Sequence, residues 1–349
     1  MHEHALVVGK FAPLHRGHQL LLDRASEVAD NLTAVVWSNP DFDEMPSTVR
    51  AGWIRELYPH AEVIVGDGGP LNIASGPEHW AFVAGLIASH GCTPDVVLSS
   101  EAYGPPFAAH LGTAHIDVDS TRSMWPVSGT DIRADVHAHR ADLDPRVYRH
   151  FVERVVFLGA ESTGKSVLAG RMAEEFETEF VAEYGRLYYE ERDGELDVED
   201  YVTIATRHRE LEDDAALRAC RYLFIDTNAL TTMFFSHYYN RDSLPALRVM
   251  ADNCRARYQH VIVCDDDIPF EQDGWRDSAM WRARMEGMVL HDLAVRGIEY
   301  HMVSGSLDDR VAQVKAVLGG RSGAPEHRAR SLGPRPADRG AKTDGPQGG

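Results

Sequence analysis

Short apolar runs alternate with amphipathic stretches along the first half of the chain. The runs lie at 5–8, 32–37, 61–65 and 95–98, and helical patterns lie between them at 47–57 and 78–89. Apolar runs of this length that alternate with helical patterns indicate parallel strands joined by crossover helices. The pattern therefore predicts an α/β domain over residues 1–150.

A second alternation of the same kind begins at Phe151. Its apolar runs lie at 155–158, 179–181, 222–225 and 260–264, with a fifth expected at 300–303. We expect residues 134–148 to be mostly helical and the charged, histidine-rich stretch from about 135 to 150 to act as a connector. A second parallel-sheet α/β domain is predicted over 151–318. Residues 319–349 lack large apolar side chains, so a disordered tail is predicted there.

The composition argues against several classes of protein. The 349 residues carry a formal net charge of −19, whereas a nucleic-acid groove needs a basic stripe. No stretch approaches the roughly 18 apolar residues of a membrane helix, and the N-terminus has no secretion signal. The four cysteines have no metal-ligand spacing and are expected to be free thiols in a reducing compartment. We expect a cytoplasmic protein that binds neither DNA nor membranes, while homo-oligomerisation stays open.

The segment GKFAPLHRGH, residues 9–18, directly follows the first apolar run and combines several groups that bind polyphosphate. Gly9 lets the backbone approach an anion closely, and Lys10 supplies a point charge. His15 and His18 are three residues apart, so at a helix start they share one face beside the helix's own amide donors. The segment predicts a polyphosphate site to which Gly9, Phe11 and Gly17 also contribute.

A second segment, VSGTDIR at 127–133, supplies groups that the first lacks. Ser128 and Thr130 offer hydroxyls, Gly129 permits close backbone approach, and Arg133 offers a forked cation for terminal phosphates. The pair resembles the H-x-G-H and I-S-[ST]-T-x-[IL]-R motifs that the nucleotidyltransferase superfamily places across one active site. The resemblance implies a Rossmann-like domain in which an acceptor phosphate attacks the α-phosphorus of ATP. The two histidines, Lys10 and Arg133 would then stabilise the departing pyrophosphate.

The segment GAESTGKS, residues 159–166, fits the P-loop pattern G-x-x-x-x-G-K-[ST] and follows an apolar run, as that motif requires. Backbone amides from Glu161 to Lys165 are expected to cradle the β-phosphate. Lys165 would bridge β and γ oxygens, and Ser166 would ligate Mg²⁺. The nucleotide contacts predicted in this loop are Gly159, Glu161, Ser162, Thr163, Gly164 and Ser166.

Three further segments complete the predicted kinase site. YLFID ends in Asp226, placed as a second ligand of Mg²⁺. VAEYGR places Glu183 and Arg186 behind a strand, where Glu183 could accept a hydroxyl proton or hold a ribose diol. The stretch 271–285 is interpreted as a lid whose Arg276 closes over the transferring phosphate. Arg282 and Arg284 are weaker candidates that could simply face solvent.

The order of these motifs resembles one family. An H-x-G-H segment followed by a P-loop, with VAEYGR, FIDTNALTT and QDGWR, is similar to the NadR-type bifunctional nicotinamide-nucleotide adenylyltransferase/ribosylnicotinamide kinases over residues 5–318. Further matching strings are EMPSTVRAGWIRELYP, SSEAYG and DSTRSMWPVSGT. Some members begin with a helix-turn-helix repressor domain, for which this sequence has no room before its first strand. We therefore expect no DNA binding.

The resemblance implies a two-step route to NAD. The P-loop kinase half would phosphorylate the 5′-hydroxyl of nicotinamide riboside with ATP and Mg²⁺. The first half would join the resulting nicotinamide mononucleotide to AMP, giving NAD and pyrophosphate. The implied dinucleotide site is lined by Arg50, Trp80, Glu101 and Tyr103. The implied riboside site comprises Tyr184, Arg186, Asp226, Thr227, Asn228, Gln272, Asp273, Gly274 and Arg276.

Two alternatives stay open at the level of sequence. One is an adenylyltransferase–nucleoside kinase fusion with a different acceptor, because the phosphate loops do not identify the acceptor. The other is a regulatory protein that senses NAD or ATP and in which only the kinase half is active. Both loops retain every polar group that the chemistry needs, which favours the bifunctional enzyme.

Overall fold

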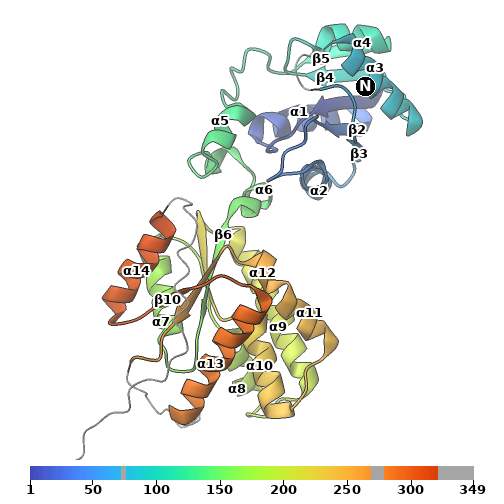
Figure 1. Cartoon of the computed structure of the whole chain (residues 1–349). Coiled ribbons are helices and arrows are strands. Elements are labelled where there is room, and N and C mark those ends of the chain that lie inside the picture. Colours follow the sequence, from blue (N-terminus) through green and yellow to red (C-terminus); the bar gives the residue numbers. More distant parts are fainter. Residues whose placement is uncertain (72–75, 269–278, 321–349) are drawn as a thin grey trace, which may run out of the picture.

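The structure is a computed structural model, and it describes residues 1–71, 76–268 and 279–320 (Figure 1). The predicted lid residues Gln272, Asp273, Gly274 and Arg276 and nearly all of the predicted tail lie outside these ranges. Two five-stranded sheets, one from each half of the chain, form the centres of two α/β units. The predicted α/β class is confirmed.

The first sheet is parallel and has the order β3-β2-β1-β4-β5. Its strands are β1 (His2–Gly9), β2 (Ala29–Trp37), β3 (Glu62–Gly66), β4 (Val96–Ser99) and β5 (Ala114–Asp117). The helices that join them are α1 (Arg16–Val28), α2 (Ser47–Leu57), α3 (Pro77–Ser89) and α4 (Gly104–Leu111). The order reverses between β1 and β4, and ligands of open α/β sheets bind beyond the carboxyl ends of the strands at such a point. The loop that follows β1 begins at this position.

Strand β1 is buried on both faces, as its apolar sequence predicts. Val7 lies opposite Ala34 of β2 and Leu98 of β4. Val7 packs into the larger apolar core, whereas its neighbour Leu6 packs into a separate cluster on the other face. Burial on both faces gives a continuous apolar run rather than an alternating one, which is how the strand was recognised.

The second sheet is also parallel, with the order β10-β9-β6-β8-β7. Its strands are β6 (Glu153–Leu158), β7 (Phe180–Val181), β8 (Tyr222–Asp226), β9 (His260–Cys264) and β10 (His301–Val303). Its helices are α7 (Lys165–Glu175), α8 (Tyr184–Glu191), α9 (Val198–Ala216), α10 (Ala229–Asn240), α11 (Pro245–Asp252), α12 (Cys254–Arg257), α13 (Ala279–Arg296) and α14 (Leu307–Gly319). β6 is central, so the loop after it emerges between β8 and β9.

Every strand expected from the apolar runs is present, but the sequence pattern missed β5. This edge strand is only partly buried and has no continuous apolar run. The helix expected over 134–148 is wrong. Only α5 (Gly129–Ala134), a short 3₁₀ turn at Arg140–Asp142 and α6 (Pro145–Tyr148) are helical in this region. Asp144 caps α6, and Pro145 cannot occupy a helix interior, so the chain breaks where one helix was expected.

The connector lies against the first unit before it enters β6 (Figure 1). Arg149 forms an ion pair with Glu56 of α2 at 2.8 Å, and the ring of His150 lies 2.9 Å from the carbonyl oxygen of Glu44. Leu143 pairs with His15 as an isolated antiparallel bridge, so the connector also touches the predicted nucleotide loop. Among the described helices, none is both long and apolar enough to cross a bilayer.

Candidate functional sites

The two histidines of the first loop are positioned by the start of α1. His15 is the N-cap residue, and its Nδ1 accepts a hydrogen bond from the amide of Gly17 at 3.1 Å. The rings of His15 and His18 stack with centroids 3.9 Å apart. Because Nδ1 of His15 is an acceptor, the neutral ring carries its proton on Nε2. The ring therefore offers an N–H donor beside the amino end of a helix, where anions are favoured.

Both histidines are neutral at pH 7 in this structure. Burial, followed by the charge of Arg122, lowers the pKa of His15 to about 4. Burial and the neighbouring His15 lower the pKa of His18 well below its usual value. These rings would therefore carry positive charge only when a bound anion raises their pKa values.

The two predicted nucleotide segments meet directly. Ser128 caps α5 and exchanges hydrogen bonds with Asp131, as in a capping box. Arg133, in the last turn of α5, donates a hydrogen bond to the carbonyl of Ala12 in the first loop. A Cβ on Gly129 would lie 2.9 Å from the carbonyl oxygen of Ala12, so a side chain there would separate the segments.

These segments line a cavity of about 430 Å³ at the carboxyl edge of the first sheet. The predicted site residues that line it are Gly9, Lys10, His15, Gly17, His18, Trp80, Glu101, Tyr103, Ser128, Gly129, Thr130 and Arg133. Two predicted residues do not line it. Phe11 is fully buried against the His18 ring, with ring centroids 5.0 Å apart, and Arg50 is fully buried behind the loop. The structure thus brings residues from both segments to one cavity.

Arg50 supports the loop from behind rather than facing the cavity. Its guanidinium donates to the carbonyls of Met45 and Lys10, to the hydroxyl of Ser38 and to the carboxylate of Asp41. Hydrogen bonds from backbone amides and from Arg50 outweigh desolvation and lower the pKa of Asp41 to about 2. The sequence pattern placed Arg50 correctly in a helix but could not show which way it faces.

The cavity also contains residues to which sequence reasoning gave no role: Trp37, His79, Asp119, Arg122 and Trp125. Trp37 packs edge-on against His79, with ring centroids 5.1 Å apart. Arg122 lies 3.3 Å from the carboxylate of Glu101. Asp119, Arg122 and Trp125 belong to the quoted string DSTRSMWPVSGT, so the signal was present, but nothing in the string itself indicated the orientation of these side chains.

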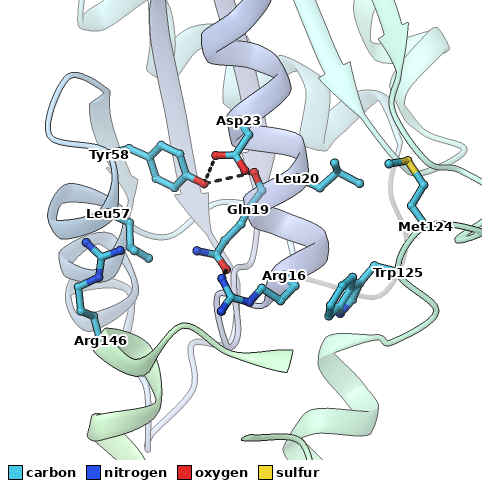
Figure 2. A pocket seen from close by; sticks show the side chains of 9 residues that line it. All are labelled: Arg16, Gln19, Leu20, Asp23, Leu57, Tyr58, Met124, Trp125 and Arg146. Carbon is cyan, nitrogen blue, oxygen red and sulfur yellow. Dashed lines mark hydrogen bonds between the residues drawn. The ribbon is translucent and has the colours of Figure 1, made fainter. Parts of the chain in front are cut away.

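A separate pocket of about 510 Å³ lies beside α1 (Figure 2). It is lined by Arg16, Gln19, Leu20, Asp23, Leu57, Tyr58, Met124, Trp125 and Arg146. The Tyr58 hydroxyl donates to Asp23 at 2.7 Å and to the carbonyl of Gln19 at 3.2 Å. Figure 2 shows Arg146 of α6 on one side of this pocket and Trp125 on the other. Because Trp125 also lines the first cavity, the two hollows share a wall.

The loop Gly159–Ser166 joins β6 to α7 as a P-loop does. Gly159 and Gly164 have positive φ angles of 137° and 79°. A Cβ on Gly159 would lie 2.6 Å from the carbonyl oxygen of Cys264, so only glycine fits against β9. Lys165 Nζ donates to the carbonyl of Ala160 at 2.7 Å, and the buried Thr163 hydroxyl donates to the same carbonyl at 2.8 Å. Gly164 is the N-cap residue of α7, which places the loop at a helix N-terminus, a position that favours phosphate.

Ser166 and Asp226 are brought together from distant parts of the chain. The hydroxyl of Ser166 donates to Oδ2 of Asp226. The other oxygen, Oδ1, is buried and has no hydrogen-bond partner among the described residues. A buried carboxylate oxygen without a donor, next to a hydroxyl, fits the oxygen ligands that Mg²⁺ prefers. The donor set is therefore compatible with the predicted magnesium site.

The remaining predicted kinase residues lie on β7–α8 and β8–α10. Glu183 is the N-cap residue of α8, and burial, followed by the charge of Asp226, raises the pKa of its carboxyl group. Thr227 has a positive φ of 65°, and Asn228 caps α10 through its side-chain oxygen, which accepts from Leu230 at 3.0 Å. Tyr184 is partly buried and Arg186 is exposed. Glu183 is thus close enough to Asp226 for the two carboxyl groups to interact electrostatically.

Comparison with known proteins finds a family model for part of the chain and relatives that cover most of it. A family model described as an AAA domain matches residues 154–310, the unit that contains the P-loop. The trifunctional NAD biosynthesis/regulator protein NadR of Escherichia coli strain K12 is 29% identical over 318 residues, which cover 84% of this chain and 77% of that protein. The NadR of Salmonella typhimurium strain LT2 is 28% identical over 342 residues, covering 90% of this chain and 83% of that protein. The chain is similar to the NadR proteins over most of its length. The resemblance that its motifs indicate is confirmed.

Solved NadR structures share the fold. A crystal structure of a NadR protein in complex with NAD and AMP-PNP matches with a TM-score of 0.68 and 21% identity, covering 94% of this chain and 99% of that chain. Another, of a NadR protein in complex with NR, matches with a TM-score of 0.70 and 21% identity, covering 91% and 97%. At this identity the likeness establishes the arrangement of the two sheets and no more.

Proposed function

We propose that this chain is a bifunctional enzyme of NAD biosynthesis. It would phosphorylate nicotinamide riboside with ATP and then transfer an adenylyl group from a second ATP to the mononucleotide, giving NAD and pyrophosphate. One observation carries the proposal. The chain combines two separate phosphate loops, each with its partner residues in place, and resembles NAD biosynthesis proteins over most of its length.

In the kinase step, the P-loop amides and Lys165 would hold the phosphates while Glu183 accepts the proton of the 5′-hydroxyl. A raised pKa makes Glu183 a stronger base than an exposed carboxylate, which suits this role. Ser166 and Asp226 would hold Mg²⁺, which supplies charge neutralisation for the phosphate oxygens. The lid role of Arg276 stays a prediction from the sequence. So does the place of Gln272, Asp273 and Gly274 in the riboside site.

In the adenylyl-transfer step, no side chain of the first cavity needs to attack. The phosphate of the mononucleotide would displace pyrophosphate at the α-phosphorus, and the protein would contribute position and charge stabilisation. Lys10 and Arg133 are the cations, and the neutral Nε2–H of His15 would donate to the phosphate, with the His18 ring stacked beside it. Trp80 and Tyr103 offer flat apolar surface in the same cavity for the nicotinamide ring.

A regulatory role is the second candidate, because the matched relatives are named as regulators as well as biosynthesis proteins. Such a protein would bind NAD or ATP at the first cavity without turnover and retain only the kinase step. The complete set of polar groups around that cavity favours catalysis.

The test is to incubate the chain with ATP, Mg²⁺ and nicotinamide riboside and to separate the products by chromatography. Mononucleotide followed by NAD supports the proposal. Mononucleotide alone indicates the regulatory protein with an active kinase half. If the riboside gives no product but another phosphorylated acceptor is adenylylated, the chain is an adenylyltransferase–nucleoside kinase fusion with a different acceptor.

Two substitutions assign the steps to the two sites. Lys165→Ala should abolish mononucleotide formation yet leave NAD formation from added mononucleotide. His18→Ala should have the reverse effect. The exposed Lys315→Ala and His90→Ala are matched controls that should change neither step. If either site variant stopped both steps equally, the assignment of one step to each site would be wrong.

A further inference from the structure

Helix α13 carries Arg282, which is buried although the sequence allowed it to face solvent. Only 5% of the surface of Arg282 is exposed. Arg284, two residues further along, is exposed. The two residues are therefore chemically matched but lie on different faces of the same helix.

The guanidinium of Arg282 has unused donors. Nη1 donates to the carbonyl of Ile268 at 2.9 Å. Nε and Nη2 are buried and have no hydrogen-bond partner within the described part of the chain. A buried charged donor without an acceptor is costly, so such groups usually meet a ligand or an ion. Two adjacent N–H groups of one guanidinium match the oxygens of a phosphoryl or carboxylate group.

The face of α13 that holds Arg282 lies against the P-loop. The Cδ1 atom of Ile268, whose carbonyl Arg282 contacts, lies 3.5 Å from the position that a Cβ on Gly164 would take. Met285, which follows Arg282 by three residues and so shares its face, packs with Ala160 in a small apolar cluster. The carbonyl of Ala160 accepts a hydrogen bond from Lys165. Two contacts thus connect this face to both ends of the phosphate loop.

A cluster of carboxylates, which includes Glu286 of the same helix, gives Arg282 a competing role. Asp265, Asp266 and Glu286 can place one oxygen each within 4.8 Å of one another. Burial and the two aspartates raise the pKa of Glu286 to about 7. This cluster attracts cations, so Arg282 could instead serve as its counter-charge. In that role Arg282 would matter for folding and would not distinguish between bound nucleotides.

We propose that Arg282 binds the terminal phosphoryl group of the nucleoside triphosphate held by the P-loop, through Nε and Nη2. The identification of this group as the one transferred to the riboside rests on the proposed function. In that step the bond from phosphorus to the bridging oxygen of ADP breaks and a bond to the acceptor oxygen forms. Arg282 forms no covalent bond and neutralises charge on the non-bridging oxygens.

The experiment compares the affinity of the full chain for AMP-PNP and for ADP, each with Mg²⁺, by calorimetry. R282Q should weaken AMP-PNP binding on the order of 10- to 100-fold and ADP binding less than about 3-fold, because only the triphosphate carries the recognised group. R282K should retain part of the AMP-PNP affinity, since lysine keeps the charge and loses the fork. R284Q, the exposed control, should change neither affinity.

Equal loss of ADP and AMP-PNP affinity, or a lowered Tm with both affinities unchanged, would overturn the proposal and identify Arg282 as a counter-charge. If R282Q does not fold, arginine-selective ¹⁵N NMR of the wild-type chain decides. The Nε–H resonance that R282K removes should shift with AMP-PNP and not with ADP. A wild-type chain without riboside kinase activity would contradict the proposed function, while the AMP-PNP to ADP comparison would still test Arg282.

Discussion

The hydroxyl of Ser166, in the first turn of α7, donates a hydrogen bond to Oδ2 of Asp226 at the end of β8. Sixty residues of chain separate the two side chains, and the pairing of β6 with β8 brings them together. Because Oδ1 of Asp226 is buried without a hydrogen-bond partner among the described residues, the pair has the oxygen atoms that the proposed Mg²⁺ site would use.

Asp226→Asn should lower riboside phosphorylation on the order of 100-fold, because an amide is a weaker ligand for Mg²⁺ than a carboxylate. NAD formation from added mononucleotide should not change. Calorimetric titration with Mg²⁺ in the presence of ADP would show the lost affinity directly. Asp308→Asn, at an exposed position in α14, is the control, and an equal loss in that variant would contradict a specific role for Asp226.

Gly129→Ala should lower adenylyl transfer at least about tenfold, because its Cβ would lie 2.9 Å from the carbonyl oxygen of Ala12 and push the two segments apart. The kinase step should be unaffected. Gly52→Ala is the matched control. Gly52 lies in α2 with nothing within 4 Å of its Cβ position, so alanine there should stabilise the chain by about 0.5–1 kcal/mol. Unchanged adenylyl transfer in the Gly129 variant would show that the close approach is unnecessary.

The chain should lose stability as the pH falls from about 6.5 to 4 because of its buried histidines. The folded state holds the pKa of His15 near 4, below the value of 6.5 for an unperturbed histidine. In this window the unfolded chain binds a proton at His15 that the folded chain does not, so acid favours unfolding by up to about 1.4 kcal/mol per pH unit. Above pH 6.5 the effect of His15 vanishes.

His15→Asn tests this pH dependence, since asparagine retains N-cap capacity without titrating. Urea unfolding at pH 7 and pH 5 should show a smaller loss of stability in the variant than in the wild type. An identical pH dependence in both proteins would mean that His15 is not the titrating group.

Arg50→Met should destabilise the first unit by about 2–4 kcal/mol, since it removes the buried guanidinium that donates to four acceptors. Adenylyl transfer should also slow, mainly through a lower kcat, because Arg50 no longer holds the backbone of Lys10 in place. Chemical unfolding measures the first effect and steady-state kinetics the second. Arg55→Met, on the exposed face of the same helix, should cost less than about 1 kcal/mol.

The sequence by itself determined the strands that have continuous apolar runs, the two glycine-bearing loops and their order along the chain. Strands buried on both faces show as continuous apolar runs, and the glycines of GAESTGKS and VSGTDIR occupy positions where backbone geometry or a close contact excludes a side chain. These are local requirements, so the sequence alone expresses them. The edge strand β5 was missed because it has no continuous apolar run, and the helix after Ala134 was mispredicted although Asp144 and Pro145 mark a break there.

Only the tertiary structure decided which way individual side chains face. Arg50 and Arg282 both lie on helices, and both turned out to be buried, one supporting a loop and the other with donors unused. The depressed pKa values of His15 and His18, and the meeting of Arg133 with Ala12, likewise depend on contacts between distant segments. Burial and electrostatic environment arise from packing across the sheet, and no spacing along the chain encodes them.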